Sequence, residues 1–227
     1  MLPRRGAAVV LAILALILSV VGWLALQWGK LNPYLVPGEV LGGAFWQPLT
    51  WLWLSTGAFR VLLSAFLLWI LGSQLELLWG RPRFWRFCIG VPFLAGILTL
   101  LLAWVWPALE ARQFEGGGVL TTALWLALGL EIGKRQLNFF GFGLTGHLFA
   151  ALGLAFVLLE AIFNTPAAVV PSLAGVFLCF LWLRSGGLWE RYGSWRMGRK
   201  FALRRKRMNI LVGGKRNTPT DSDPYVH

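Results

Sequence analysis

The chain has 227 residues, of which 57% are hydrophobic and 13% are charged, whereas charged residues make up about 25% of a soluble globular domain. This composition leaves too little polar surface for a water-soluble globule, so the lipid bilayer must be the solvent for most of the chain. The formal charge of +12 does not indicate a nucleic-acid-binding protein, because the basic residues lie in short segments beside apolar runs, where they set membrane orientation.

Long apolar runs predict an all-α membrane protein with six transmembrane helices. The expected helices cover about 6–28, 51–71, 87–106, 119–132, 139–163 and 167–183. The first run is too long for the apolar part of a signal peptide and lacks a small-residue cleavage site, so we expect it to span. The fourth is shorter than the roughly 20 residues that a span needs, so we expect other helices to surround it.

The segment 30–48, between the first two helices, is rich in turn residues but also carries large apolar side chains. Pro33 and Pro37 favour turns, while Phe45 and Trp46 favour contact with lipid. This mixture predicts an interfacial loop or short helix that lies at the membrane surface.

Lysine and arginine side chains are concentrated in alternate connections. They are Arg4, Arg5, Arg81, Arg83, Arg86, Lys134 and Arg135, followed by a basic stretch between Arg184 and Arg216. This bias predicts that both termini are cytoplasmic, in a multi-pass protein of the cell membrane that we expect to be a bacterial inner membrane. The predicted parts are a cytoplasmic N-terminus at 1–5, a membrane domain at 6–186 and a basic cytoplasmic tail at 187–227, disordered at its end.

The residues that most often bind metals are scarce. Cys88 and Cys179 both lie inside apolar runs, where buried thiols are inert packing groups. Together with His147 and His227 they form no metal-binding spacing. We expect no metal and no cofactor.

Three stretches around the second helix resemble the rhomboid family of intramembrane proteases. They are FWQPLT at 45–50, LSTG at 54–57 and WILGSQLELLWG at 69–80. The most specific part is the Trp79-Gly80 end, which basic residues and an apolar helix follow. The resemblance, which extends over about 31–214, implies a compact bundle of six transmembrane helices with an interfacial loop between helices 1 and 2.

The catalytic residues of that family are missing where the resemblance places them. Rhomboid proteases carry a serine in a G-x-S-G sequence on a short central helix and a histidine in an A-H-x-x-G sequence on the sixth helix. In this chain Gly118 takes the place of the serine and Ser172 takes the place of the histidine, while Gly175 is kept. Catalytic residues are therefore expected to be absent.

The positions that would stabilise the oxyanion also differ. The family's H-x-x-x-N becomes Arg60-x-x-x-Ser64, the histidine ahead of it becomes Ser55, and the arginine of the interfacial loop becomes Gln47. Nucleophile, base and oxyanion donors are each worth orders of magnitude in rate. The resemblance thus implies a pseudoprotease that binds or regulates transmembrane client proteins without cleaving them, with membrane lipids and these clients as its partners.

Two other functions remain open from the sequence. An intramembrane serine endopeptidase could use rearranged residues, and Ser64 with His147 is then the conceivable pair. A small membrane carrier or scaffold is the other alternative, although the chain shows no inverted repeat or paired broken helices.

Small residues and two charges complete the expected site. We expect Gly118, Thr122 and Ala123 to pack closely against Gly175, because small residues let helices approach in lipid. Arg60, about two turns inside the second predicted helix, would be costly in lipid. We therefore expect it in a water-filled cavity, paired with Glu115 or, as second choice, Glu160.

Six spans make a simple prediction about topology. Reporter domains fused after Gly42, Arg83, Ala111, Arg135 and Gly186 should alternate between the two sides of the membrane. Two neighbouring fusions that report the same side would contradict the number of spans.

Overall fold

The computed structural model describes residues 6–29, 31–139 and 142–184. The predicted N-terminal segment 1–5 and the predicted basic tail 187–227 lie outside these residues. Within them, five helices are long and apolar enough to cross a membrane, and one further apolar helix is shorter.

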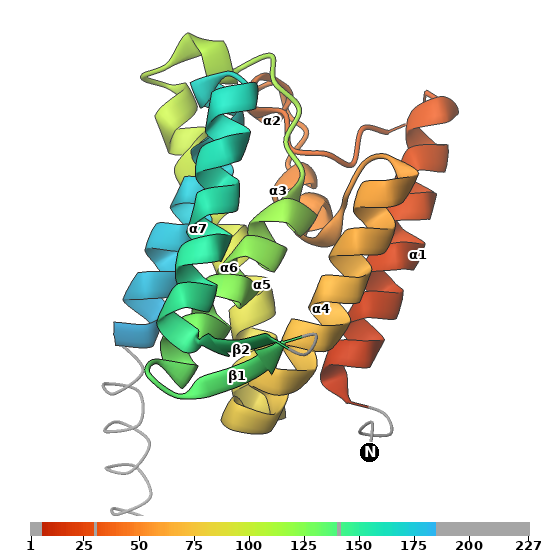
Figure 1. The fold of residues 1–227 in the computed structure, drawn as a ribbon. Helices are drawn as coiled ribbons and strands as arrows, with labels where there is room; N and C mark the ends of the chain where they lie inside the picture. The colour runs from red at the N-terminus through yellow and green to blue at the C-terminus, as the bar shows by residue number, and fades with distance from the viewer. Residues whose placement is uncertain (1–5, 30, 140–141, 185–227) are drawn as a thin grey trace, which may run out of the picture. The chain divides into compact units, whose positions relative to one another are not determined.

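Counted together with a shorter helix between the third and the fourth, the long helices alternate in direction through one bundle (Figure 1). They are α1 (Ala7–Gln27), α4 (Ala58–Trp79), α5 (Arg81–Ala103), α7 (Gly146–Phe163) and the last span (Pro166–Arg184), which starts as the 3-10 helix η3 (Pro166–Val169). The shorter apolar helix is α6 (Gly116–Ile132). The integral membrane architecture predicted from composition is therefore present as an assembly of apolar helices.

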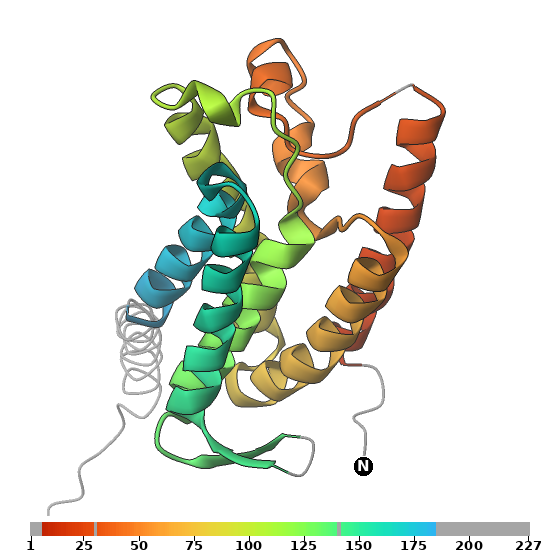
Figure 2. The same cartoon turned by 45° about the horizontal axis from the view of Figure 1, so that its top comes forward.

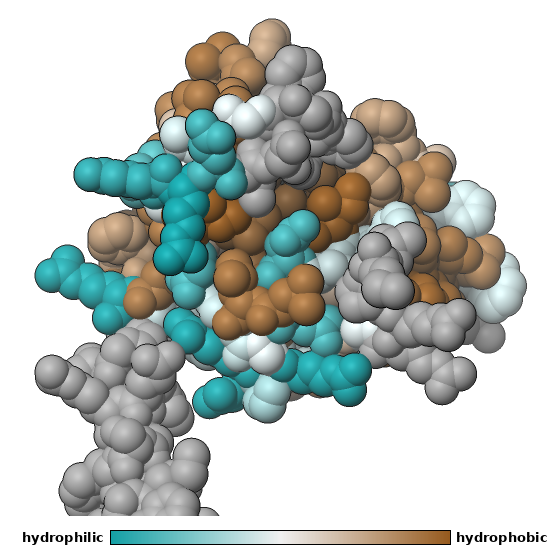
Figure 3. Space-filling model, turned by 60° about the horizontal axis from the view of Figure 1, so that its bottom comes forward, coloured by the Kyte–Doolittle hydropathy of each residue, from teal (hydrophilic) through white to brown (hydrophobic). Residues whose placement is uncertain are grey.

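The connections define two ends of this bundle. The loop end holds α2 (Pro37–Leu41), α3 (Gln47–Thr50), η1 (Trp51–Trp53) and η2 (Pro107–Leu109). The hairpin end holds the antiparallel strands β1 (Gln136–Phe139) and β2 (Phe142–Thr145). Figure 3 looks onto the hairpin end and shows hydrophilic side chains gathered there. Arg81 and Arg86 at the start of α5, and Lys134 and Arg135 after α6, are exposed at this end.

Helix α6 is the centre of the bundle. It packs against α4, α5, α7 and η1, and against the last span, where the Cys179 thiol donates a hydrogen bond to the Ala123 carbonyl at 3.3 Å. Its 17 residues make it only about 25 Å long at 1.5 Å per residue. Figures 1 and 2 show an extended segment that runs from the loop end down to the start of α6. The prediction of a short, surrounded fourth helix is confirmed.

The second predicted helix begins later than expected, at Ala58 rather than near residue 51. Trp51 and Leu52 are instead buried in the core of the loop end, with Leu35, Leu109 and Phe114. Gly57, at φ 76°, lies in the left-handed region that favours glycine, and it turns the chain into α4. Arg60 therefore lies in the first turn of the helix and not two turns inside it.

The fifth predicted helix also begins later, at Gly146 instead of Phe139. Residues 136–139 and 142–145 pair as the antiparallel strands of the β-hairpin, which the all-α prediction missed. The sequence there holds Gly141 and Gly143, and glycine in a helix interior is unfavourable. The Thr145 hydroxyl accepts a hydrogen bond from the Leu148 N–H at 3.4 Å and so caps α7 at its true start.

Gly118 does not lie at the close helix contact that the sequence predicted. A Cβ atom added at Gly118 would have no neighbour within 4 Å. On Gly175, by contrast, it would lie 2.6 Å from Val119 Cγ1. A further close contact joins α6 to α7 at Gly129, where an added Cβ would lie 2.6 Å from the Ala150 nitrogen.

The same substitution by alanine should have different effects on the free energy of unfolding at two glycines of α6, Gly129 and Gly118. Gly129→Ala should lower the free energy of unfolding by about 1–3 kcal/mol, because the backbone of α7 must move to admit the methyl group. Gly118→Ala, the matched control on α6, should be neutral or stabilise by up to about 1 kcal/mol. Denaturant titration of both purified variants in detergent measures this difference. Equal stability of the two would contradict the α6–α7 contact.

Candidate functional site

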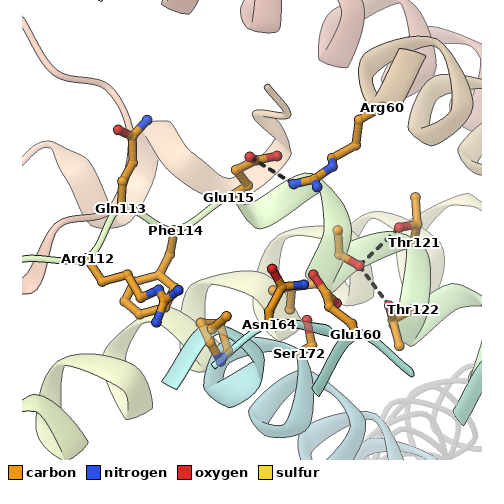
Figure 4. Close-up of a pocket in the computed structure, with 14 residues that line it drawn as sticks. Arg60, Arg112, Gln113, Phe114, Glu115, Thr121, Thr122, Glu160, Asn164 and Ser172 are labelled. Carbon is orange, nitrogen blue, oxygen red and sulfur yellow. Dashed lines mark hydrogen bonds and ion pairs between the residues drawn. The ribbon is translucent and has the colours of Figure 1, made fainter. Parts of the chain in front are cut away.

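A cavity of about 360 Å³ opens among α4, α6, α7 and the last span, on the side of the loop end (Figure 4). It exists because α4 and α7 each pack extensively on α6 but not on one another, and because α6 begins below the loop end. Polar side chains dominate its wall: Arg60, Arg112, Gln113, Glu115, Thr121, Thr122, Glu160, Asn164 and Ser172.

The Glu115 carboxylate is the most highly bonded group of this wall. Its Oε2 accepts a hydrogen bond from the Thr56 N–H at 2.9 Å, and its Oε1 accepts from the Thr56 hydroxyl and from Arg60 Nη1, the latter at 3.1 Å. Glu115 directly precedes α6 and Thr56 lies just before α4. The positive ends of two helix dipoles therefore face one carboxylate, which stabilises its negative charge.

Two glycines let the start of α6 approach the chain that leads into α4. The Gly117 N–H donates to the Leu54 carbonyl at 2.9 Å. A Cβ on Gly116 would overlap the Trp51 carbonyl oxygen, and a Cβ on Gly117 would overlap the Ser55 hydroxyl. Only glycine fits at these two positions, and their close approach fixes Glu115 beside Thr56.

The third glycine of the run, Gly118, faces the cavity instead. Its carbonyl accepts hydrogen bonds from the hydroxyls of Thr121 and Thr122, at 3.0 and 2.9 Å. Ser172, on the last span, lines the same cavity. The structure thus brings Gly118, Ser172, Arg60, Glu115, Glu160 and Thr122 together around one space, while Ala123 and Gly175 lie in the packed interface behind it.

Ser55 and Ser64 do not line this cavity; their hydroxyls lie 3.2 Å apart. The Ser64 hydroxyl also donates to the Val61 carbonyl at 3.0 Å, and the Ser55 N–H donates to the Ser19 hydroxyl at 3.2 Å. These bonds tie α4 to α1.

His147 is the second residue of α7 and lies at the hairpin end, not deep in the bundle as a helix starting at Phe139 would place it. Ser64 is near the loop end, about 22 Å along α4 from Trp79 at 1.5 Å per residue. No hydrogen bond joins the two among the described residues, and the geometry separates them as a catalytic pair.

A second cavity, of about 540 Å³, lies between α1 and α4 and is lined mainly by apolar side chains such as Leu16, Val20 and Val61. Tyr34 from the loop end also lines it. Burial raises the pKa of the Tyr34 hydroxyl, and the nearby negative charge of Glu115 raises that pKa further. Thr56 lines this cavity while it bonds to Glu115, so it separates the apolar space from the polar one.

Gln47 stabilises the loop end rather than a reaction centre. Its side chain is fully buried; Oε1 accepts from the Val36 N–H at 2.9 Å, and Nε2 donates to Glu39 Oε2 at 2.5 Å. The loop predicted to be interfacial is therefore held by internal polar contacts.

Sequence reasoning missed three polar residues of the cavity wall, Arg112, Gln113 and Asn164. Arg112 was interpreted only as a charge in a connection, yet its guanidinium donates a hydrogen bond to the Thr165 hydroxyl. Asn164 directly follows α7, and no sequence motif indicated that it belongs to a site. Among the described residues, no group of three or more His, Cys, Asp or Glu side chains could hold a metal ion.

Residues 5–185 match a family whose description is "Eukaryotic integral membrane protein (DUF1751)". The chain belongs to this family. The match covers every helix described above, so the whole bundle is the family's membrane domain. No curated protein matched the chain.

Membership of this eukaryotic family corrects one expectation. A bacterial inner membrane was expected from the sequence, and that expectation is wrong because the family is eukaryotic. The protein is an integral, multi-pass membrane protein of a eukaryotic family.

Glu115 should contribute more to stability than its partner Arg60. The Arg60 side chain is 60% exposed and that of Glu115 is 17% exposed, and exposed ion pairs contribute about 0.2–1 kcal/mol. Glu115→Ala also leaves the Thr56 N–H without its acceptor, which costs about 1–3 kcal/mol. We expect Glu115→Ala to destabilise clearly more than Arg60→Ala in denaturant titrations.

The double variant is the control for this comparison. Glu115→Ala combined with Arg60→Ala should be about as stable as Glu115→Ala alone, because the ion pair is already lost. A larger effect of Arg60→Ala than of Glu115→Ala would show that the carboxylate does not join the two helix starts.

Proposed function

We propose that this protein is a rhomboid-like pseudoprotease that binds transmembrane client proteins without cleaving them. The observation that supports this most is the position of Gly118 and Ser172. The resemblance aligns them with the nucleophile and base of the proteases, and both line the same polar cavity on the central helix and the last span. Glycine offers no nucleophile, and a serine hydroxyl is no substitute for the histidine base.

In this proposal the cavity binds a client helix and does not catalyse peptide cleavage. Polar groups are costly in lipid, and a polar, solvated cavity at membrane depth lowers that cost for a guest helix. Because α4 and α7 do not pack extensively on one another, a client helix can approach the cavity between them from the bilayer. Arg60 already has a carboxylate partner, so its charge adds no unpaired cation to the wall.

The alternative of a rearranged protease is disfavoured by the positions of its candidate residues. The Ser64 hydroxyl is engaged with Ser55 and with the Val61 carbonyl, and His147 lies at the other end of the bundle. A hydroxyl that no base can reach is a weak nucleophile.

The proposal is tested with purified protein in lipid nanodiscs and fluorescent transmembrane peptides. The photoreactive residue p-benzoyl-phenylalanine is introduced in place of Gly118, where the backbone has open space, and in place of Leu101 on α5 as the control, which is 61% exposed. We expect light-dependent crosslinks to the peptides from position 118, few from position 101, and intact peptides throughout.

Two results would overturn the proposal. Equal crosslinking from both positions would mean that the cavity does not take up helices. Peptide cleavage, or labelling by a serine-reactive fluorophosphonate that Ser64→Ala or His147→Ala abolishes, would establish a protease instead.

A further inference from the structure

The polar cavity carries two cations, Arg60 and Arg112, and two carboxylates, Glu115 and Glu160, which differ in how they are bonded. Arg60 pairs with Glu115 at 3.1 Å, and Arg112 donates to the Thr165 hydroxyl in the loop end. Glu160 lines the same cavity from α7. Within the described residues, no hydrogen bond or ion pair reaches its carboxylate.

Two hydroxyls in the same wall as Glu160 donate hydrogen bonds elsewhere. The Thr121 hydroxyl donates to the Gly117 and Gly118 carbonyls, and the Thr122 hydroxyl donates to the Gly118 carbonyl. Figure 4 shows Glu160 beside Asn164, on the wall opposite the Arg60–Glu115 pair. The carboxylate is thus presented to the cavity rather than used to hold the fold.

An acidic side chain inside a transmembrane helix is costly unless it has water or a partner. Glu160 lies three residues before Phe163, the end of α7, which is about 5 Å from the helix end at 1.5 Å per residue. A cation that pairs with it must therefore reach the cavity at that same depth, about one helical turn from the loop end.

We infer that the cavity selects transmembrane clients that carry a lysine or arginine about one helical turn from their loop-end boundary, and that Glu160 is the residue that recognises this cation. The inference rests on the proposed function and names the class of client. The opening between α4 and α7 admits such a helix sideways, and pairing with Glu160 neutralises two charges that are each unfavourable alone. A client with an acidic residue at that depth is rejected by like-charge repulsion.

The test uses the whole protein in nanodiscs of phosphatidylcholine, which supplies no primary amine. Three fluorescent peptides share one apolar leucine-alanine helix and differ in a single residue one turn from its end: lysine, leucine or glutamate. Wild-type protein should bind the lysine peptide about tenfold more tightly than the leucine peptide, which corresponds to about 1.4 kcal/mol. The glutamate peptide should bind most weakly.

Two variants test whether the preference for the lysine peptide depends on the Glu160 carboxylate. Glu160→Gln should remove the preference for lysine while it leaves the affinity for the leucine peptide unchanged. Glu131→Gln, on the exposed far end of α6, should leave the preference intact. Thermal unfolding of Glu160→Gln should match the wild type, because the carboxylate makes no bond within the described fold.

The possible failures are distinguishable. If all three peptides bind equally, or if Glu160→Gln keeps the preference, this inference is overturned and the proposed function stands. If no peptide binds, the proposed function fails and the inference with it. If phosphatidylethanolamine added to the nanodiscs abolishes the lysine preference, the cation at Glu160 is a lipid amine and the assignment to clients is wrong.

Discussion

The carboxylate of Glu115 joins the starts of two helices, and the arrangement of the bundle follows from that contact. It accepts the Thr56 N–H ahead of α4 while it lies directly before the first residue of α6. Gly116 and Gly117 allow the approach, because any side chain there would overlap the chain at Trp51 or Ser55. The contact holds α6 below the loop end, and the space left above it is the polar cavity.

Lipid offers no hydrogen bonds, so a membrane protein must satisfy its polar groups from within. Gln47, Thr56 and Thr122 do so through bonds to backbone or carboxylate groups. Glu160 differs from Glu115, the other carboxylate of the cavity, in that no hydrogen bond or ion pair within the described residues reaches it. A carboxylate without a bonded partner gains most from a ligand of opposite charge, which is why a client is assigned to it.

The sequence was most informative where hydrophobicity alone decides the structure. Six apolar runs and the short central helix were predictable because length and burial in lipid are local properties of the chain. The starts of α4 and α7 were missed because Trp51, Leu52 and the phenylalanines of the β-hairpin are apolar like the helices that follow them. Three consecutive glycines look alike in sequence, yet tertiary contacts enclose Gly116 and Gly117 and leave Gly118 open. Arg60 and Glu115 could be paired in advance because a charge inside a predicted span requires a partner and because the rhomboid resemblance places Glu115 ahead of the emptied nucleophile position.

The tie between Arg60 and Glu115 also has a consequence for biosynthesis. The two residues are 55 positions apart, so at about 5–20 residues per second the ribosome adds the carboxylate about 3–11 s after the arginine. During that interval most of α4 and all of α5 are synthesised while the guanidinium has no carboxylate partner and the Leu54 carbonyl has no α6 to bond. The N-terminal half of the bundle therefore stays incomplete until the central helix arrives, and an insertion machinery or water at the membrane surface must hold Arg60 until then.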